Sequence, residues 1–267
     1  IASPKASHDR VYETTKRYVK YDLAPASLAS GSSMASSRHP MPNTSRVKRP
    51  SLFGYSYKSF QQVNEDASYA INSMHTLQSF LYPFGSDETP IGIGIEASIL
   101  KSKDRNQMGP LSLSGRAMVW TYRGFDMGLW GVGSLNVLSH EEMKNSALGR
   151  DVLTAGLSMR KELKHFYVEN LLGYTMPSKA KQKIGQIDYE HDYGGIVTAG
   201  VHPGFIISKL RLGGFAEVYL ADYYRVRGGA FKYDSGRYRI VAIGPEVSWV
   251  EEDFSVFVNG RSLVDAT

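Results

Sequence analysis

Residues 210–220 read LRLGGFAEVYL, and this stretch decides the fold. Every second residue from Leu210 to Leu220 is uncharged, whereas the residues between them include Arg211 and Glu217. Successive side chains of a β-strand point to opposite faces of the sheet. The stretch therefore predicts a strand with one wholly uncharged face and one polar face.

The same two-residue period continues from Ser51 toward the C-terminus. It recurs at 91–99, 111–120, 153–162, 194–207, 240–249 and 254–261. On residues 111–120 it assigns Val119 to the uncharged face and Trp120 to the polar face. About eleven such strands fit into the chain, which predicts an all-β fold.

The connections between these strands alternate in length. Short turns are expected at 123–124, 163–164, 208–209 and 251–252, and long polar loops at 101–110, 140–149, 178–192 and 222–236. Short turns at one end and long loops at the other are typical of an antiparallel up-and-down β-barrel in an outer membrane.

Three features favour a barrel with its uncharged face in lipid over one with a soluble core. The strands, at roughly 10 to 14 residues, suit a tilted membrane crossing. A barrel of this width could not be filled by Ala, Val, Gly and Leu. Aromatic residues lie on the uncharged face beside the short turns, where an interfacial girdle is expected. The predicted girdle, which could instead cap a soluble core, consists of Phe125, Phe166, Phe205, Trp249 and Phe254.

The charged residues of the polar face would line the lumen. They could form a charged constriction that selects solutes, or a structural network of ion pairs that holds the wall rigid. The two signs are balanced, so no strong ion preference is expected. The predicted lumen-lining residues are Glu96, Arg116, Arg160, Glu162, Arg211, Glu217, Glu246 and Arg261.

The N-terminal segment has a different character. Residues 1–50 carry nine basic and three acidic side chains, whereas the rest of the chain carries 22 and 23. Residues 23–50 are rich in Ser and Pro and show no period. The chain therefore divides into a basic N-terminal extension or plug (1–50) and a transmembrane barrel (51–267), and the extension could contact a protein partner.

Residues 51–267 resemble bacterial outer-membrane β-barrel proteins of the porin or transporter type as a class. That resemblance implies residence in the bacterial outer membrane, contact with the lipid bilayer and an even number of strands. About twelve strands are therefore expected. The twelfth could lie outside this sequence, be supplied by residues 10–21, or have been overlooked within 64–90.

The function expected from this reading is passive passage of small solutes through an outer-membrane pore or transporter. The alternative is a closed barrel that acts as a scaffold or binds a partner. No enzyme is expected, because His140 and His191, with the acidic residues around them, lack the spacing of a catalytic or metal site. No cofactor, metal or nucleic-acid partner is expected, and the absence of cysteine excludes a disulfide framework.

Overall fold

A computed structural model describes residues 51–59, 71–85, 90–102, 106–123, 125–135, 151–184, 186–234, 236–251 and 254–266. Within these ranges there is no helix of the length and apolar character needed to cross a membrane. Eleven strands form one curled sheet: β1 (Ser51–Ser59), β2 (Ile71–Gly85), β3 (Pro90–Ser102), β4 (Asn106–Tyr122), β5 (Phe125–Leu135), β6 (Val152–Glu162), β7 (Phe166–Pro177), β10 (Ile196–Ile207), β11 (Leu210–Ala221), β14 (Tyr238–Val250) and β15 (Phe254–Ala266).

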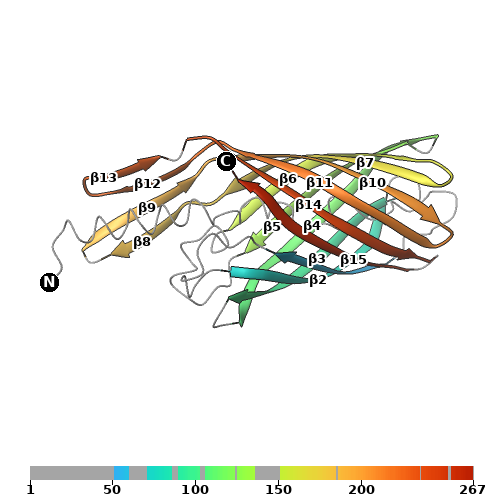
Figure 1. The fold of residues 1–267 in the computed structure, drawn as a ribbon, viewed down its shortest axis with the longest axis horizontal. Helices are drawn as coiled ribbons and strands as arrows, with labels where there is room; N and C mark the ends of the chain where they lie inside the picture. The colour runs from blue at the N-terminus through green and yellow to red at the C-terminus, as the bar shows by residue number, and fades with distance from the viewer. Residues whose placement is uncertain are drawn as a thin grey trace.

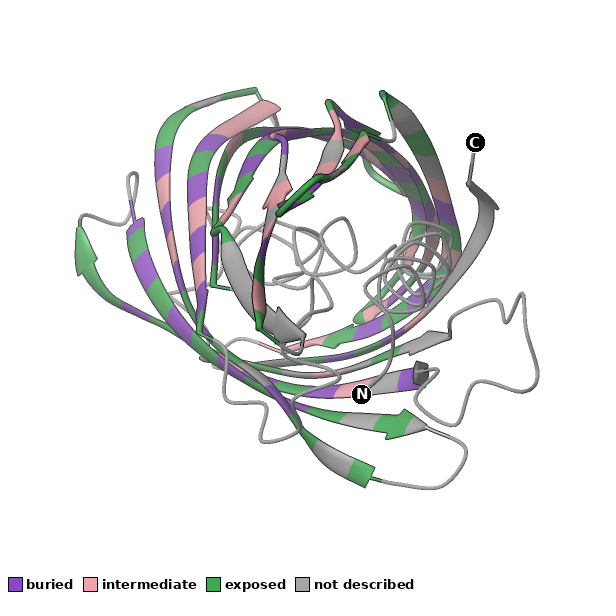
Figure 2. Cartoon of the chain, turned by 90° about the vertical axis from the view of Figure 1, so that its left-hand side faces the viewer, coloured by how far each residue is buried: buried purple, intermediate pink, exposed green. Residues whose placement is uncertain are grey.

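Strands that follow one another along this sheet pair antiparallel, which confirms the predicted all-β antiparallel fold. The ends of the sheet meet where β1 pairs with β15 in parallel, and the strands surround a central space (Figure 2). An odd number of alternating strands begins and ends in the same direction, so its closure must be parallel. Twelve strands are not confirmed, because the described ranges supply eleven to this sheet. Residues 10–21, the suggested source of another strand, lie outside those ranges.

Two predicted loops are wrong, and a third, predicted at 101–110, is shorter than expected because β3 runs to Ser102 and β4 begins at Asn106. Residues 178–192 and 222–236 form two hairpins, which pair into a second sheet in the order β13-β12-β9-β8 and project from one end of the barrel (Figure 1). We call this sheet the extension. Its polar composition suggested loops, but backbone pairing and ion pairs stabilise it as strands. The extension consists of β8 (Ala180–Ile184), β9 (Ile187–Tyr193), β12 (Tyr224–Gly228) and β13 (Phe231–Asp234).

Burial alternates along the barrel strands, as the bands of colour show (Figure 2). In β6 the side chain of Arg160 is 2% exposed, whereas that of Met159 is 40% exposed. The buried charged residues thus point to the inner face, together with a cluster of apolar side chains that includes Phe80, Trp130 and Leu171, and the exposed large apolar residues lie on the outer face. Buried charges with an exposed apolar face are the reverse of a protein with an apolar core and a polar surface.

One assignment to the polar face is wrong. Trp120 is 46% exposed and lies on the outer face, as does Val119, which is 42% exposed. The register between β4 and β5 shifts between Met118 and Trp120. Such an irregularity directs two consecutive side chains to the same face, which a strict two-residue period cannot predict.

Candidate functional site: the charged inner face

Most of the predicted lumen-lining residues lie on the inner face of the barrel. Glu162 is also on this face, at the end of β6, with 23% of its side chain exposed. Arg261 lies in β15, but its side chain is outside the description. The predicted residues that are buried, with exposures from 0% to 9%, are Glu96, Arg116, Arg160, Arg211, Glu217 and Glu246.

Glu162 joins two arginines from different strands. Arg160 Nη2 donates to Glu162 Oε2 at 2.7 Å, and Arg211 Nη1 donates to the same oxygen at 3.1 Å. Arg211 belongs to β11, so this contact passes over β7 and β10. Because Glu162 directly precedes the short turn to β7, the cluster ties the inner wall together at the turn end of the barrel.

Residues of alternating charge form a row across four neighbouring strands. Asp126 in β5 lies opposite Arg160, and Arg160 lies opposite Glu169 in β7. Glu169 in turn lies opposite His202 in β10. Directly opposed residues are close enough to interact, so each basic group in this row has an acidic neighbour.

A second cluster surrounds Glu217 in β11. Its Oε1 is 3.3 Å from His202 Nε2, and its Oε2 accepts a hydrogen bond from the Tyr219 hydroxyl. The ring of His202 stacks on Phe215, with 5.6 Å between the ring centroids. All four side chains are buried, so the carboxylate is held by neighbours rather than by bulk water.

Arg116 differs from the other two buried arginines. Its side chain is 3% exposed, and none of its three guanidinium nitrogens has a well-aligned hydrogen bond to a described residue, although the Tyr82 hydroxyl lies close enough to interact with it. A buried guanidinium with so few hydrogen bonds is unfavourable. The side chains that act on it electrostatically are Tyr82, Glu169, Arg160 and Asp126.

Aromatic side chains on the inner face lie over glycines of the next two strands. Trp130 lies over Gly156 and Gly173, and Tyr167 lies over Gly204 and Gly213, where an added Cβ would come within 3 Å of the aromatic side chain. Glycine therefore leaves room for these rings to lie along the wall. The large side chains of Trp130 and Tyr167 thus lie along the inner face instead of pointing toward the centre of the barrel.

The predicted girdle lies in the strands beside the short turns. Phe205 and Trp249 are 62% and 46% exposed on the outer face, whereas Phe125 and Phe166 are half-buried. The rings of Phe166 and Phe205 meet edge to face, with 5.7 Å between centroids. Phe254 begins β15, but its side chain is outside the description.

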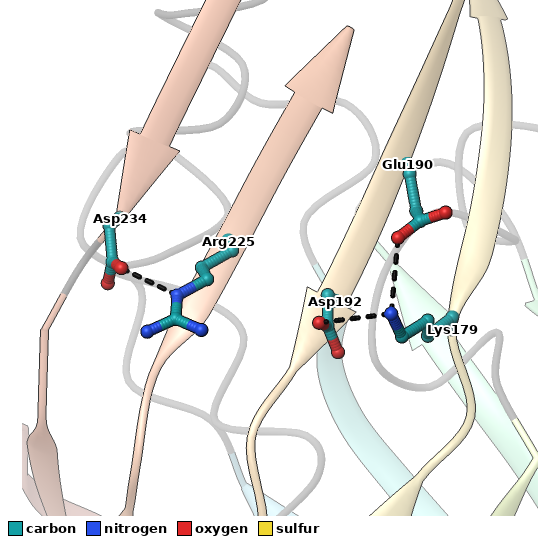
Figure 3. Close-up of polar contacts among 5 residues, drawn as sticks. All are labelled: Lys179, Glu190, Asp192, Arg225 and Asp234. Carbon is teal, nitrogen blue, oxygen red and sulfur yellow. Dashed lines mark hydrogen bonds and ion pairs between the residues drawn. The ribbon is translucent and has the colours of Figure 1, made fainter.

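The extension is held by exposed ion pairs (Figure 3). Lys179 Nζ is 3.2 Å from Glu190 Oε1 and 3.4 Å from Asp192 Oδ2, and these contacts raise the pKa of Lys179. Arg225 Nε donates to Asp234 Oδ2 at 2.6 Å across β12 and β13. This hydrogen bond, with one from the Gly236 amide, lowers the pKa of Asp234.

The described ranges contain no group of three or more His, Asp or Glu side chains that could hold a metal ion. His191 lies in β9, and His140 is outside those ranges. No family model matches the chain, and no curated protein matches it significantly in sequence.

Glu169 and Tyr82 were not among the predicted lumen-lining residues. Residues 165–176 fitted the two-residue pattern poorly, because Asn170 occupies the face otherwise filled by apolar residues. The structure places Asn170 on the exposed outer face and Glu169 on the inner face. Tyr167, Glu169 and Leu171 are two residues apart and all three are buried. This two-residue spacing was the signal that could have placed Glu169 on the inner face.

Proposed function

We propose that the chain spans the bacterial outer membrane as a β-barrel and allows small polar solutes to pass through its interior. The observation that carries this proposal is the inverted distribution of polarity. Leu113, Leu153 and Leu172 are 50% or more exposed on the outer face, whereas charged side chains are buried on the inner face. Lipid is the solvent that makes such an outer face favourable.

The strand lengths support the same placement. Barrel strands β2 to β15 contain 11 to 17 residues. A tilted strand needs about 9 to 11 residues to cross the hydrocarbon core. The closure of β1 on β15 satisfies backbone groups that would otherwise be unpaired in lipid.

Ion conductance across a planar bilayer tests the passage of solutes. The full-length protein should give steady current with weak ion selectivity, since arginines and carboxylates share the inner face. Arg116→Glu should shift the reversal potential toward cation preference. Absence of current from inserted protein, or steep selectivity in the unmodified chain, would contradict the proposal.

A second candidate is a closed barrel that acts as a scaffold or binds a partner. It is favoured by the depth at which the inner charges lie, since Glu217 is 0% exposed and Arg160 is 2% exposed. Side chains that line an open water-filled pore should be more accessible. The same conductance measurement separates the two candidates, because a closed barrel inserts into the bilayer without carrying current.

A further inference from the structure

Two interruptions of the backbone pairing lie close together in the barrel, on either side of the β11–β14 pair. Between β10 and β11 the pairs stop at Val201 with Ala216 and resume at Gly204 with Gly213. Between β14 and β15 they stop at Ile243 with Ser262 and resume at Glu246 with Asn259. Pro203 lies in the first interruption and Pro245 in the second, and proline has no N–H to donate.

A groove lies on the outer face between these interruptions. It has a volume of about 470 Å³, and Pro203, Gly214 and Pro245 contribute to its lining. Gly214 and Pro245 are register partners on β11 and β14, so the groove crosses the pair of strands that the interruptions enclose. The groove is shallow and open to the surroundings of the outer wall.

The groove continues toward the turn end of the barrel. A second hollow of about 370 Å³ shares Pro203 and Gly214 with the first and reaches Phe166 and Phe205. None of the residues that line either hollow is charged. The two adjacent hollows are open to the surroundings of the outer wall, and we call them together the channel. Their apolar lining suits a flexible hydrocarbon chain that lies along the wall.

Positive charge lies at the turn end of this channel. Lys164 and His165 directly precede Phe166, and both are exposed. Lys209 follows the end of β10, where it pairs with Glu251 at 2.5 Å. Lysine beside a membrane surface favours anionic lipid headgroups. Lys164 lies only two residues before Phe166. It is therefore suited to contact the headgroup of a lipid whose acyl chain lies against Phe166.

We propose that this channel binds one acyl chain of an anionic phospholipid, with its headgroup beside Lys164. The inference rests on the proposed membrane placement, because only a bilayer presents such a lipid to the outer wall. The apolar lining and the prolines form the site for the acyl chain. The exposed side chain of Lys164 accounts for the preference for an anionic headgroup over a neutral one.

Native mass spectrometry can test the site with full-length protein released from vesicles. The vesicles contain phosphatidylcholine with a minor fraction of phosphatidylglycerol that has the same acyl chains. The intact protein should retain one phosphatidylglycerol. Ala216→Leu should reduce retention roughly tenfold by filling the groove, since two methylene groups excluded from apolar contact correspond to about one order of magnitude.

Matched variants separate the two parts of the site. Ala155→Leu adds the same side chain to the outer face of β6, away from the groove, and should leave retention unchanged. Lys164→Glu should abolish the preference for phosphatidylglycerol while phosphatidylcholine is still retained. Circular dichroism establishes that each variant is folded.

Equal retention by Ala216→Leu and the intact protein would overturn the lipid site, as would retention of several lipids without a preference. Flotation of the same samples with vesicles tests the membrane placement separately. Protein that floats without retaining phosphatidylglycerol contradicts the lipid site alone. Protein that does not float contradicts both the site and the membrane placement.

Discussion

The indole ring of Trp130 in β5 lies over Gly156, its register partner in β6. A Cβ at Gly156 would be 2.6 Å from two carbons of this ring and 2.2 Å from the carbonyl oxygen of Leu172. Phe80 lies over Gly94 and Phe215 over Gly244 in the same way, each pair on neighbouring strands. The inner wall therefore depends on matching a large ring with a residue that has no side chain.

Replacement of Gly156 by alanine should destabilise the barrel by about 1–3 kcal/mol, because the new methyl group overlaps the ring and the backbone. Urea unfolding followed by circular dichroism measures this change. Gly133 offers a matched control in β5, since a Cβ there would meet no atom within 4 Å. Equal losses from Gly156→Ala and Gly133→Ala would show that the packing of the ring is not responsible.

Glu162→Gln should lower the free energy of unfolding by about 1.5–3 kcal/mol, because two arginines lose their charged acceptor. The same urea titration provides the measurement. Glu251→Gln is the comparison at the same end of the barrel, where the carboxylate pairs with one exposed cation, Lys209, instead of two arginines. A larger loss from Glu251→Gln than from Glu162→Gln would contradict the importance of the inner cluster.

Arg116→Met and Arg160→Met should have opposite effects on stability. Among the described residues none makes a well-aligned hydrogen bond with the buried guanidinium of Arg116, so methionine should leave stability unchanged or increase it. Arg160 pairs with Glu162 at 2.7 Å, so its replacement should cost about 3–5 kcal/mol. Thermal unfolding of the two variants side by side tests this contrast, and equal losses would contradict it.

The Asp234 carboxyl should titrate below its ordinary pKa of 3.8, mainly because Arg225 donates a hydrogen bond to it. Its contribution to the β12–β13 hairpin is then fully present above pH 3.8 and is lost as the pH falls through the lowered pKa. Carbon NMR of the side chain measures the titration. Arg225→Gln should move the pKa back toward 3.8, whereas Lys232→Gln should not change it. An unchanged value in Arg225→Gln would contradict this cause.

The two-residue period was enough to predict the all-β antiparallel fold and to group Glu96, Arg160 and Glu217 on the polar faces of their strands, because the pleat of a strand fixes which side chains share a face. It could not predict the bulge that places Trp120 outside, since a bulge depends on the neighbouring strand. The polar composition of the extension predicted loops instead of strands, because these strands are stabilised by pairing between two hairpins that are distant in sequence. The alternating row through Arg160 and Glu169 depends on the register of separate strands, which the sequence of one strand does not specify.

The claim that the outer wall lies in lipid can be tested most directly by single-cysteine scanning of Val152–Glu162, since the chain has no native cysteine. Nitroxide labels at these positions report access to oxygen, which concentrates in lipid, and to a water-soluble nickel complex. In reconstituted vesicles, Leu153, Leu157 and Met159 should show high oxygen access and low nickel access, with the reverse balance at the alternate positions Thr154 and Ser158. High nickel access at Leu153, Leu157 and Met159 would place the apolar face in water and contradict the membrane-spanning account.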